Sequence, residues 1–332
     1  KDYIQNLSDQ SSNKSRKEKI RQKDIIQVMT EKTGLSKGTV SKSHSSFASF
    51  EKKMNSEIFG QSEAIEKIHN LLSCAKVGLT NELQPLANFL FIGPTSVGKT
   101  FTAKKIAKNF LGNEKHFIAK LIGANAGYVG YEEGGLLTEF VRNQPNSIVL
   151  FDEVEKCDPK ILDLLLHLLD EGYCTDNLNR KIDFSNCVMI MTSNIGSTQI
   201  KKRSVGFLDD KDNAESIYDK ELKKYLRPEL LARIEEVIHF KELDKKDLLK
   251  IINTELKIIK NRLSSKGFDI KFSKGAASFI LEKAISKTLH ARDIKNLVKE
   301  IIHVPLSKFL IVNKNTKNIT VKSLKKEIVF DY

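Results

Sequence analysis

The sequence lacks tryptophan and any long apolar run, and it has only 4 cysteines in 332 residues. No stretch approaches the roughly 20 apolar residues that cross a bilayer, so we expect no membrane insertion. The chain begins at Lys1 with no apolar leader segment, which predicts a soluble fragment of a longer polypeptide.

The cysteines are far apart in the sequence and form no C-x-x-C pair. Their spacing provides neither a zinc knuckle nor a disulfide framework, so we expect a reducing compartment. Lysine far outnumbers arginine and asparagine is frequent, as in proteins from AT-rich genomes. We expect a bacterial cytoplasm or, given this composition, the stroma of a plastid (apicoplast or chloroplast).

The formal net charge is +13, but the lysines are scattered over expected helix faces and tails. They form no basic block interleaved with aromatic residues, so we expect a solvated surface and no specific nucleic acid partner. Thr33–Ser41 does resemble the turn and recognition helix of a helix-turn-helix repressor. No third helix completes that unit, and Gly38 would weaken the recognition helix.

The segment Gly93–Thr100 has the sequence of a complete phosphate-binding loop and follows the apolar run Phe89–Ile92. Glycines let backbone N–H groups close around phosphates, and the following helix directs its positive end at the anion. Lys99 would contact the β- and γ-phosphates, and Thr100 would bind Mg²⁺. The sequence therefore predicts a site for a nucleoside triphosphate.

Two acids, Asp152 and Glu153, follow the apolar run Ile148–Phe151. Asp152 would hold Mg²⁺, directly or through water, and Glu153 would polarise the attacking water. Asn194 ends the later segment Thr192–Asn194 and would place its carboxamide beside the γ-phosphate. Together with the loop, these side chains predict hydrolysis of the bound nucleotide.

Helical patterns alternate with short apolar runs up to about Ile238, and long amphipathic helices follow. This order predicts an α/β fold, with a parallel sheet covered by helices on both faces and a smaller, mostly helical C-terminal part with a few short strands. We expect a flexible tail and linker at 1–46, a large P-loop subdomain at 47–238 and a small lid subdomain at 239–332. Strands are expected at Phe89–Ile92, Phe117–Ile122, Ile148–Phe151, Val188–Thr192, Val237–Phe240, Ile319–Lys322 and Glu327–Phe330, and C-terminal helices at Lys245–Ser264, Lys274–Lys287 and Ala291–Asn313.

An ordered set of motifs over roughly residues 21–332 resembles the second ATPase module of the Clp protein unfoldases, in the AAA+ superfamily. The set comprises Ile58–Gln61, Gly93–Thr100, Gly127–Gly135, Asp152–Lys156, Thr192–Asn194 and Arg227–Arg233. The resemblance implies ATP and Mg²⁺ as cofactors and a homo-hexamer as the assembly of the full-length protein. It also implies that Asp24–Val40 is the linker from a first ATPase module.

The resemblance assigns a role to each matching residue. Arg233 matches an arginine finger that acts on a neighbouring subunit, and Arg292 matches a second sensor in the lid. The implied catalytic residues are Glu153, Asn194, Arg233 and Arg292, and the implied nucleotide-binding residues are Ile58, Phe59, Thr95, Ser96, Val97, Gly98, Lys99, Thr100, Phe101, Asp152, Ile251 and Arg292. Ala232 and His290 depart from the family, which usually has Asn and Gly there.

Two further segments suggest how such a module would work. Tyr128 lies among glycines in Gly127, Tyr128, Val129 and Gly130, and we expect this loop to grip client polypeptides in the pore of the hexamer. Val205, Gly206 and Phe207 lie in a charged segment and resemble the tripeptide that docks C-type Clp unfoldases onto the ClpP peptidase ring.

We therefore expect an ATP-driven unfoldase of the C type. Its partners would be unfolded or tagged client proteins, a ClpP-type peptidase and adaptor proteins. A disaggregase that works without a peptidase is the first alternative. A nucleic-acid-remodelling AAA+ ATPase and a nucleotide-binding scaffold that no longer hydrolyses ATP are the others.

Overall fold

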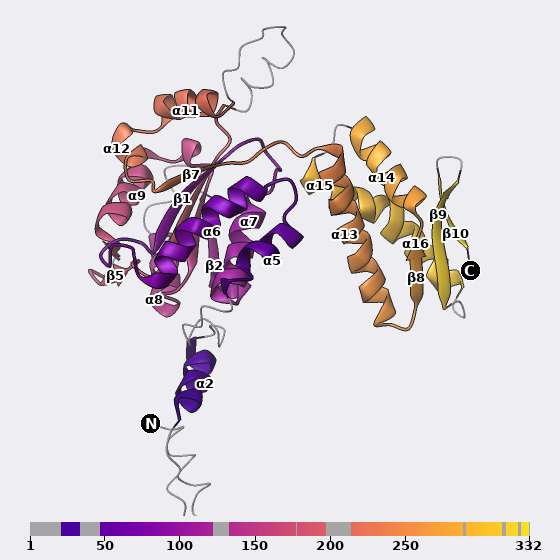
Figure 1. Ribbon diagram of the computed structural model, residues 1–332, viewed down its shortest axis with the longest axis horizontal. Helices are drawn as coiled ribbons and strands as arrows, with labels where there is room; N and C mark the ends of the chain where they lie inside the picture. Colours follow the sequence, from indigo (N-terminus) through magenta and orange to yellow (C-terminus); the bar gives the residue numbers. More distant parts are fainter. Residues whose placement is uncertain are drawn as a thin grey trace, which may run out of the picture.

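The computed structural model describes residues 21–33, 47–121, 133–176, 178–196, 214–287, 290–313, 317–324 and 327–331. Most of these residues form two bodies joined by a single connecting segment, as Figure 1 shows. The helix α2 (Gln22–Thr33) lies apart from both bodies in that view.

The larger body is built on a five-stranded parallel sheet in the order β2-β3-β6-β1-β7. The strands are β1 (Ala87–Ile92), β2 (Phe117–Leu121), β3 (Ile148–Asp152), β6 (Val188–Ser193) and β7 (Glu236–His239). Each strand lies where the sequence predicted one. β1 and β6 are buried at every position, because helices cover both faces of a parallel sheet and leave no polar side.

Alternate side chains of the strands enter two separate cores. Phe89 and Phe91 of β1 belong to one core, and Leu90 and Ile92 belong to the other. The first core is covered by α5 (Phe50–Glu57), α6 (Ser62–Val77), α7 (Lys99–Ile106) and the π turn η1 (Ala107–Leu111), and the second by α8 (Glu133–Asn143), α9 (Pro159–Glu171), α11 (Ala214–Tyr225) and α12 (Pro228–Leu231). The predicted α/β class is confirmed.

The smaller body follows β7 and has a core of its own. Its helices are α13 (Lys245–Ser264), α14 (Lys274–Ser286), α15 (Ala291–Val298) and α16 (Val304–Val312). A three-stranded sheet in the order β10-β9-β8 lies at its outer side in Figure 1, formed by β8 (Asp269–Phe272), β9 (Asn318–Leu324) and β10 (Glu327–Asp331). The expected mostly helical C-terminal part with short strands is confirmed. None of the described helices combines the length and the apolar character needed to cross a bilayer.

The structure differs from the expected elements in one helix and in several short elements that were not predicted. The expected helix Ala291–Asn313 contains a π turn, η4 (Lys299–His303). Pro305, at the start of α16, has no N–H to donate to the preceding turn, so the backbone widens there. The hairpin of β4 (Tyr173–Thr175) and β5 (Lys181–Asp183), the strand β8 and the 3₁₀ turns η2 (Glu114–His116) and η3 (Val154–Lys156) were not predicted, because such short elements show no periodic pattern.

The segment between β7 and α13 connects the two bodies, and its first residues are fastened to the larger one. Phe240 N donates to Ile92 O at 2.7 Å. The buried side chain of Gln61 donates to Lys241 O at 2.8 Å and accepts from Lys241 N at 3.0 Å. Asp244 then caps α13 by accepting from a backbone N–H of its first turn.

Candidate nucleotide-binding site

The phosphate-binding loop connects β1 to α7, and two glycines with positive φ determine its path. Gly93 has a φ of +147°, and a Cβ there would lie 2.4 Å from Phe240 O, so a side chain does not fit. Gly98 has a φ of +106°, and nothing lies within 4 Å of an added Cβ. Since α7 begins at Lys99, the loop ends at a helix N-terminus, where backbone N–H groups favour an anion.

The ammonium group of Lys99 is held inside the loop, and the residue is only 7% exposed. Nζ donates to Gly93 O at 2.6 Å, to Pro94 O at 2.7 Å and to Asn194 Oδ1 at 2.7 Å. Burial lowers the pKa of Lys99 to about 8, and the negative charge of Glu155 opposes that shift. An ammonium group whose contacts are neutral oxygens is well suited to receive phosphate oxygens.

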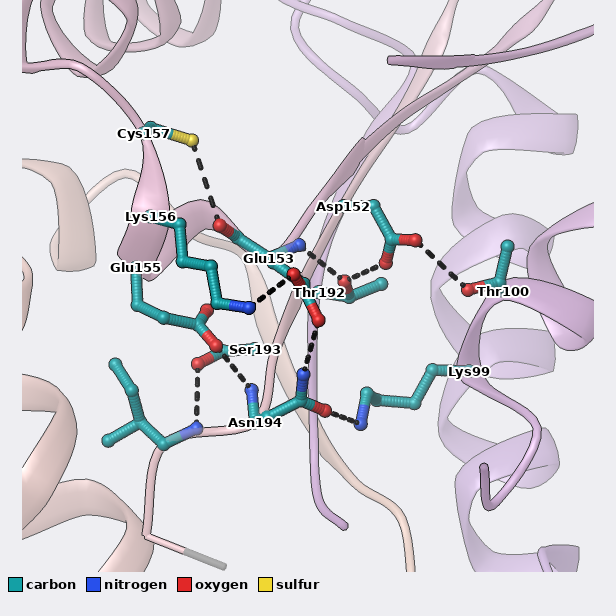
Figure 2. A network of polar contacts seen from close by, with 11 residues as sticks. Lys99, Thr100, Asp152, Glu153, Glu155, Lys156, Cys157, Thr192, Ser193 and Asn194 are labelled. Atoms are coloured by element: carbon teal, nitrogen blue, oxygen red, sulfur yellow. Dashed lines mark hydrogen bonds and ion pairs between the residues drawn. The ribbon is translucent and has the colours of Figure 1, made fainter. Parts of the chain in front are cut away.

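Asp152 and Glu153 lie where β3 ends, beside the ends of β6 and the start of α7 (Figure 2). Asp152 Oδ2 lies 3.4 Å from Thr100 Oγ1. Asp152 Oδ1 accepts a hydrogen bond from the Thr192 hydroxyl, and Glu153 N donates to that same hydroxyl at 3.0 Å. The geometry brings together the two acids and the threonine that the sequence assigned to one site.

The Glu153 carboxylate has a different partner on each oxygen. Asn194 Nδ2 donates to Oε1 at 3.0 Å, and Lys156 Nζ donates to Oε2 at 2.8 Å. Asn194 N donates to Glu155 Oε1 at 3.0 Å, which fixes the backbone of Asn194. In Figure 2 the Asn194 carboxamide lies between Lys99 and Glu153, so one side chain contacts both the cation of the loop and the acid.

A pocket of about 430 Å³ opens over these groups, between the two bodies. This volume lies within the range of roughly 300–1,000 Å³ that small-molecule sites occupy. The lining from the larger body is Glu57, Ile58, Phe59, Thr95, Ser96, Val97, Gly98, Lys99, Thr100, Phe101, Lys104, Asp152, Glu153 and Asn194, and the rest is Leu243, Ile251, Thr254, Glu255, Ala291, Arg292 and Lys295.

All the residues that the sequence assigned to nucleotide binding line this pocket, together with Glu153 and Asn194. Sequence reasoning missed Glu57, Lys104, Leu243, Thr254, Glu255, Ala291 and Lys295. Helical spacing could have found some of them, because Thr254 follows Ile251 by three residues and Lys295 follows Arg292 by three.

The oxygens of Thr100 and Asp152 fit Mg²⁺, which prefers hydroxyl, carboxylate, phosphate and water ligands. In the part of the chain that the structure describes, no cluster of three or more His, Cys, Asp or Glu side chains could hold a metal by itself. A Mg²⁺ ion at this position would therefore share its ligands with phosphate oxygens and water.

Arg233 does not line the pocket of its own chain. It follows α12, and its Nε donates to Asp170 Oδ1 at 2.6 Å. Arg227 pairs with Asp163 in the same way, at 2.7 Å, and both acids lie on α9.

The two departures from the family motifs have ordinary backbone conformations. Ala232 is helical, with φ −68° and ψ −17°. His290 is extended, with φ −99° and ψ 174°, so the position does not require glycine. His290 N donates to Asp293 Oδ2 at 3.1 Å, which starts α15 and fixes the turn that carries Arg292.

Three of the expected segments lie wholly or partly outside the described residues. The expected pore loop, Gly127–Gly130, and the expected docking tripeptide, Val205–Phe207, lie outside the described residues. The helix-turn-helix-like segment lies outside them from Gly34 onward.

Two sequence families match the chain in consecutive segments. Residues 84–237 match the AAA domain (Cdc48 subfamily), and residues 243–323 match the C-terminal, D2-small domain of ClpB protein. The boundary between the two matches falls in the segment that connects the two bodies.

Curated relatives and solved structures give the same result. The chain is 39% identical over 282 residues to the chloroplastic chaperone protein ClpD of Arabidopsis thaliana, covering 78% of this chain and 30% of that protein. It is 35% identical over 326 residues to the chaperone protein ClpB of Prochlorococcus marinus, covering 94% and 38%. It is similar to an S. cerevisiae Hsp104–ADP complex, with a TM-score of 0.77 and 31% identity over 93% of this chain and 56% of that one. The chain thus spans about a third of the length of these curated relatives.

Proposed function

This chain belongs to the Clp/Hsp100 family of AAA+ ATPases, and on that basis we propose that it is the C-terminal ATPase module of a protein unfoldase. The observation that carries the proposal is the meeting of Lys99, Asp152, Glu153 and Asn194 at one pocket. We divide the chain into a tail and linker at 1–46, a large ATPase subdomain at 47–238 and a lid at 239–332.

In this proposal the larger body binds the phosphates of ATP. The backbone N–H groups of Thr95–Gly98 and the ammonium group of Lys99 hold them, and Thr100 and Asp152 hold Mg²⁺. Mg²⁺, when bound, offsets phosphate charge and helps to align the terminal phosphate. Ile58, Phe59 and Ile251 provide apolar surface for adenine.

Glu153 takes the proton of the attacking water in this proposal. In the structure Asn194 donates to one oxygen of its carboxylate and Lys156 donates to the other, so both oxygens are held in place. Phosphate oxygens compete with Asn194 Oδ1 for Lys99 Nζ, because a charged acceptor binds an ammonium group more strongly than a carboxamide does. The Asn194 carboxamide is then available to orient the water beside Glu153.

The assembly we propose is a homo-hexamer of the full-length protein, in which Arg233 completes the site of the next subunit. Arg233 lies away from its own pocket and is held by Asp170, which supports a role in a neighbour. An arginine placed on the γ-phosphate offsets charge that develops during phosphoryl transfer. Arg292 does the same from the lid of the same chain.

The client of this machine is an unfolded or tagged polypeptide, which we propose that Tyr128 and its neighbours at 127–130 pull through the pore. As a C-type unfoldase, the protein would also bind a ClpP-type peptidase, docked through Val205, Gly206 and Phe207, and adaptor proteins. Chloroplastic relatives support a plastid stroma, with a bacterial cytoplasm as the alternative.

A disaggregase that works without a peptidase is a second candidate. The match of residues 243–323 to the small domain of ClpB and the likeness to Hsp104 favour it. Family membership argues against the nucleic-acid-remodelling alternative. The lysine, acids and arginine expected of an active ATPase are all present, which argues against a scaffold that no longer hydrolyses ATP.

Unfolding of a stably folded, tagged fluorescent client by the full-length hexamer tests the proposal. We expect the fluorescence to fall only with ATP, because pulling requires turnover. Persistent fluorescence despite ATP turnover would rule out the unfoldase.

Addition of the cognate ClpP peptidase separates the two candidates. A C-type unfoldase degrades the client, and Phe207→Ala weakens degradation without changing ATP turnover, since one apolar contact is lost from each of six docking loops. Release of intact, unfolded client in the presence of ClpP supports the disaggregase.

A further inference from the structure

We propose that Thr192 is a positioning residue for ATP hydrolysis, because its single hydroxyl orients both acids at the end of β3. The inference rests on the proposed roles of Asp152 and Glu153 and names the side chain that sets their geometry.

Thr192 lies on β6, directly beside the end of β3. Met191 pairs with Phe151, so Thr192 and Asp152 are the next neighbours toward the carboxyl edge of the sheet. Thr192 is fully buried, and Val188–Met191 before it are apolar and buried. A hydroxyl group in such a place is costly unless it is hydrogen-bonded, and both of its partners here belong to the site acids.

The chemistry of the hydroxyl leaves one arrangement. A threonine hydroxyl has one hydrogen to donate and lone pairs that accept. Glu153 N–H can only donate, so the hydroxyl accepts from it and gives its own hydrogen to Asp152 Oδ1 (Figure 2). Oδ2 then remains to face Thr100, 3.4 Å away. Thr192 therefore leaves Oδ2 as the carboxylate oxygen of Asp152 that would be available to hold Mg²⁺.

The same hydroxyl holds an unusual backbone conformation at Glu153. Glu153 has φ 58° and ψ 55°, in the left-handed region that residues other than glycine rarely adopt. Thr192 accepts from Glu153 N, and Lys156 N donates to Glu153 O at 2.9 Å, so the backbone is held on both sides. In this conformation the Glu153 side chain reaches Asn194. Without the hydroxyl, Glu153 N–H would lose its partner and the strained turn would relax.

Substitutions of Thr192 in the full-length, assembled protein test the proposal. Thr192→Val keeps the shape of the side chain and removes the hydroxyl, whereas Thr192→Ser keeps the hydroxyl. Thr102→Val is the matched control, because Thr102 is equally buried and its hydroxyl has no hydrogen-bond partner among the described residues.

We expect Thr192→Val to lower kcat by roughly 10–100-fold, the usual loss when the partner that orients a metal ligand is removed. Mg²⁺ should also be less effective in strengthening nucleotide binding. In calorimetry, a higher Mg²⁺ concentration should be needed to reach half of its effect on the affinity. Binding without Mg²⁺ should stay within about twofold of the native value, because the phosphate loop is untouched. Thr192→Ser and Thr102→Val should retain kcat within about threefold.

A kcat within threefold of the native value in Thr192→Val overturns the proposal, and so do equal losses in Thr192→Val and Thr192→Ser. If Thr192→Val does not fold by circular dichroism, the ratio of kcat between Thr192→Ser and Thr192→Ala decides by the same criterion. Absence of ATP turnover in the native hexamer would be a failure of the proposed function instead.

Discussion

The two walls of the nucleotide pocket are built in different ways. The strand-end wall consists of Lys99, Asp152, Glu153 and Asn194 from the larger body, and the lid wall consists of Ile251, Thr254, Glu255, Ala291, Arg292 and Lys295 from the smaller one. In the strand-end wall, Lys99, Asn194 and Glu153 form a continuous chain of hydrogen bonds. In the lid wall, Glu255 pairs with Lys295 at 3.6 Å, and Thr254 donates to a backbone oxygen of its own helix, α13.

The difference assigns separate tasks to the two walls. The strand-end wall stands on a parallel sheet whose strands are buried, so its side chains keep their mutual geometry. The lid wall reaches the pocket through one connecting segment, and Arg292 is exposed. Substitutions in the strand-end wall should therefore change the rate of chemistry, and substitutions in the lid wall or its connector should mainly change capture of the nucleotide.

Glu153→Gln in the strand-end wall should have the largest effect. The amide keeps the size and the contact with Asn194 but cannot accept a proton, so kcat for ATP should fall by roughly 10²–10⁴-fold. Affinity for ATP, measured by calorimetry, should stay within about threefold, because Lys99 and the loop are unchanged. A large loss of affinity with little loss of kcat would contradict the division between the walls.

The sequence predicted the strand-end wall well because its parts are local. A buried parallel strand is a short apolar run, and Asp152, Glu153 and Asn194 each follow such a run within two residues. The glycines and lysine of the loop are also contiguous. The five strands and the class of the smaller body follow from the same patterns.

The contacts that could not be predicted from the sequence are those between segments that are distant in the chain. Thr192 and Asp152 are 40 residues apart, and only the register of β3 on β6 makes them neighbours. The contact of Lys99 with Asn194 and the pairing of Arg233 with Asp170 also join residues that are distant in the sequence and meet only in the fold. Most residues of the lid wall were not predicted. They lie on two helices, α13 and α15, and which of their residues face the pocket depends on how the two bodies meet.

Arg292→Ala in the lid wall should have an intermediate effect. Loss of a charge-assisted hydrogen bond to phosphate costs about 1.5–3 kcal/mol, which corresponds to roughly 10–100-fold in kcat/KM. Much of the change should fall on KM if the lid acts in capture. The melting temperature should not change, since the Arg292 side chain is exposed and outside the core of the smaller body. Arg292→Lys should recover only part of the loss, because lysine lacks the planar fork that binds two phosphate oxygens.

Gln61→Met, at the residue that holds the segment connecting the two bodies, should have the smallest effect of the three substitutions. It is the most sensitive test of the difference between the two walls. Gln61 is 2% exposed, and its side chain pairs with both backbone groups of Lys241, while its Nε2 also lies 3.5 Å from Val97 O of the phosphate loop. The neighbouring Gly60 lies close to the start of α13, since a Cβ there would be 2.5 Å from Asp247 Oδ2. The loop and the connector are therefore fastened together at this point.

Methionine fills the same space without the hydrogen bonds, so the connector should loosen. We expect KM for ATP to rise by roughly 3–10-fold with kcat within about threefold, the consequence of two modest hydrogen bonds lost at a hinge. Lys241→Met is the matched control. It removes only the exposed ion pair with Glu63, at 2.6 Å, and leaves the backbone contacts of Gln61 in place, so its kinetics should be native. If Gln61→Met lowered kcat as strongly as Glu153→Gln does, the connector would be setting the geometry of the strand-end wall, and the two walls would work as one unit.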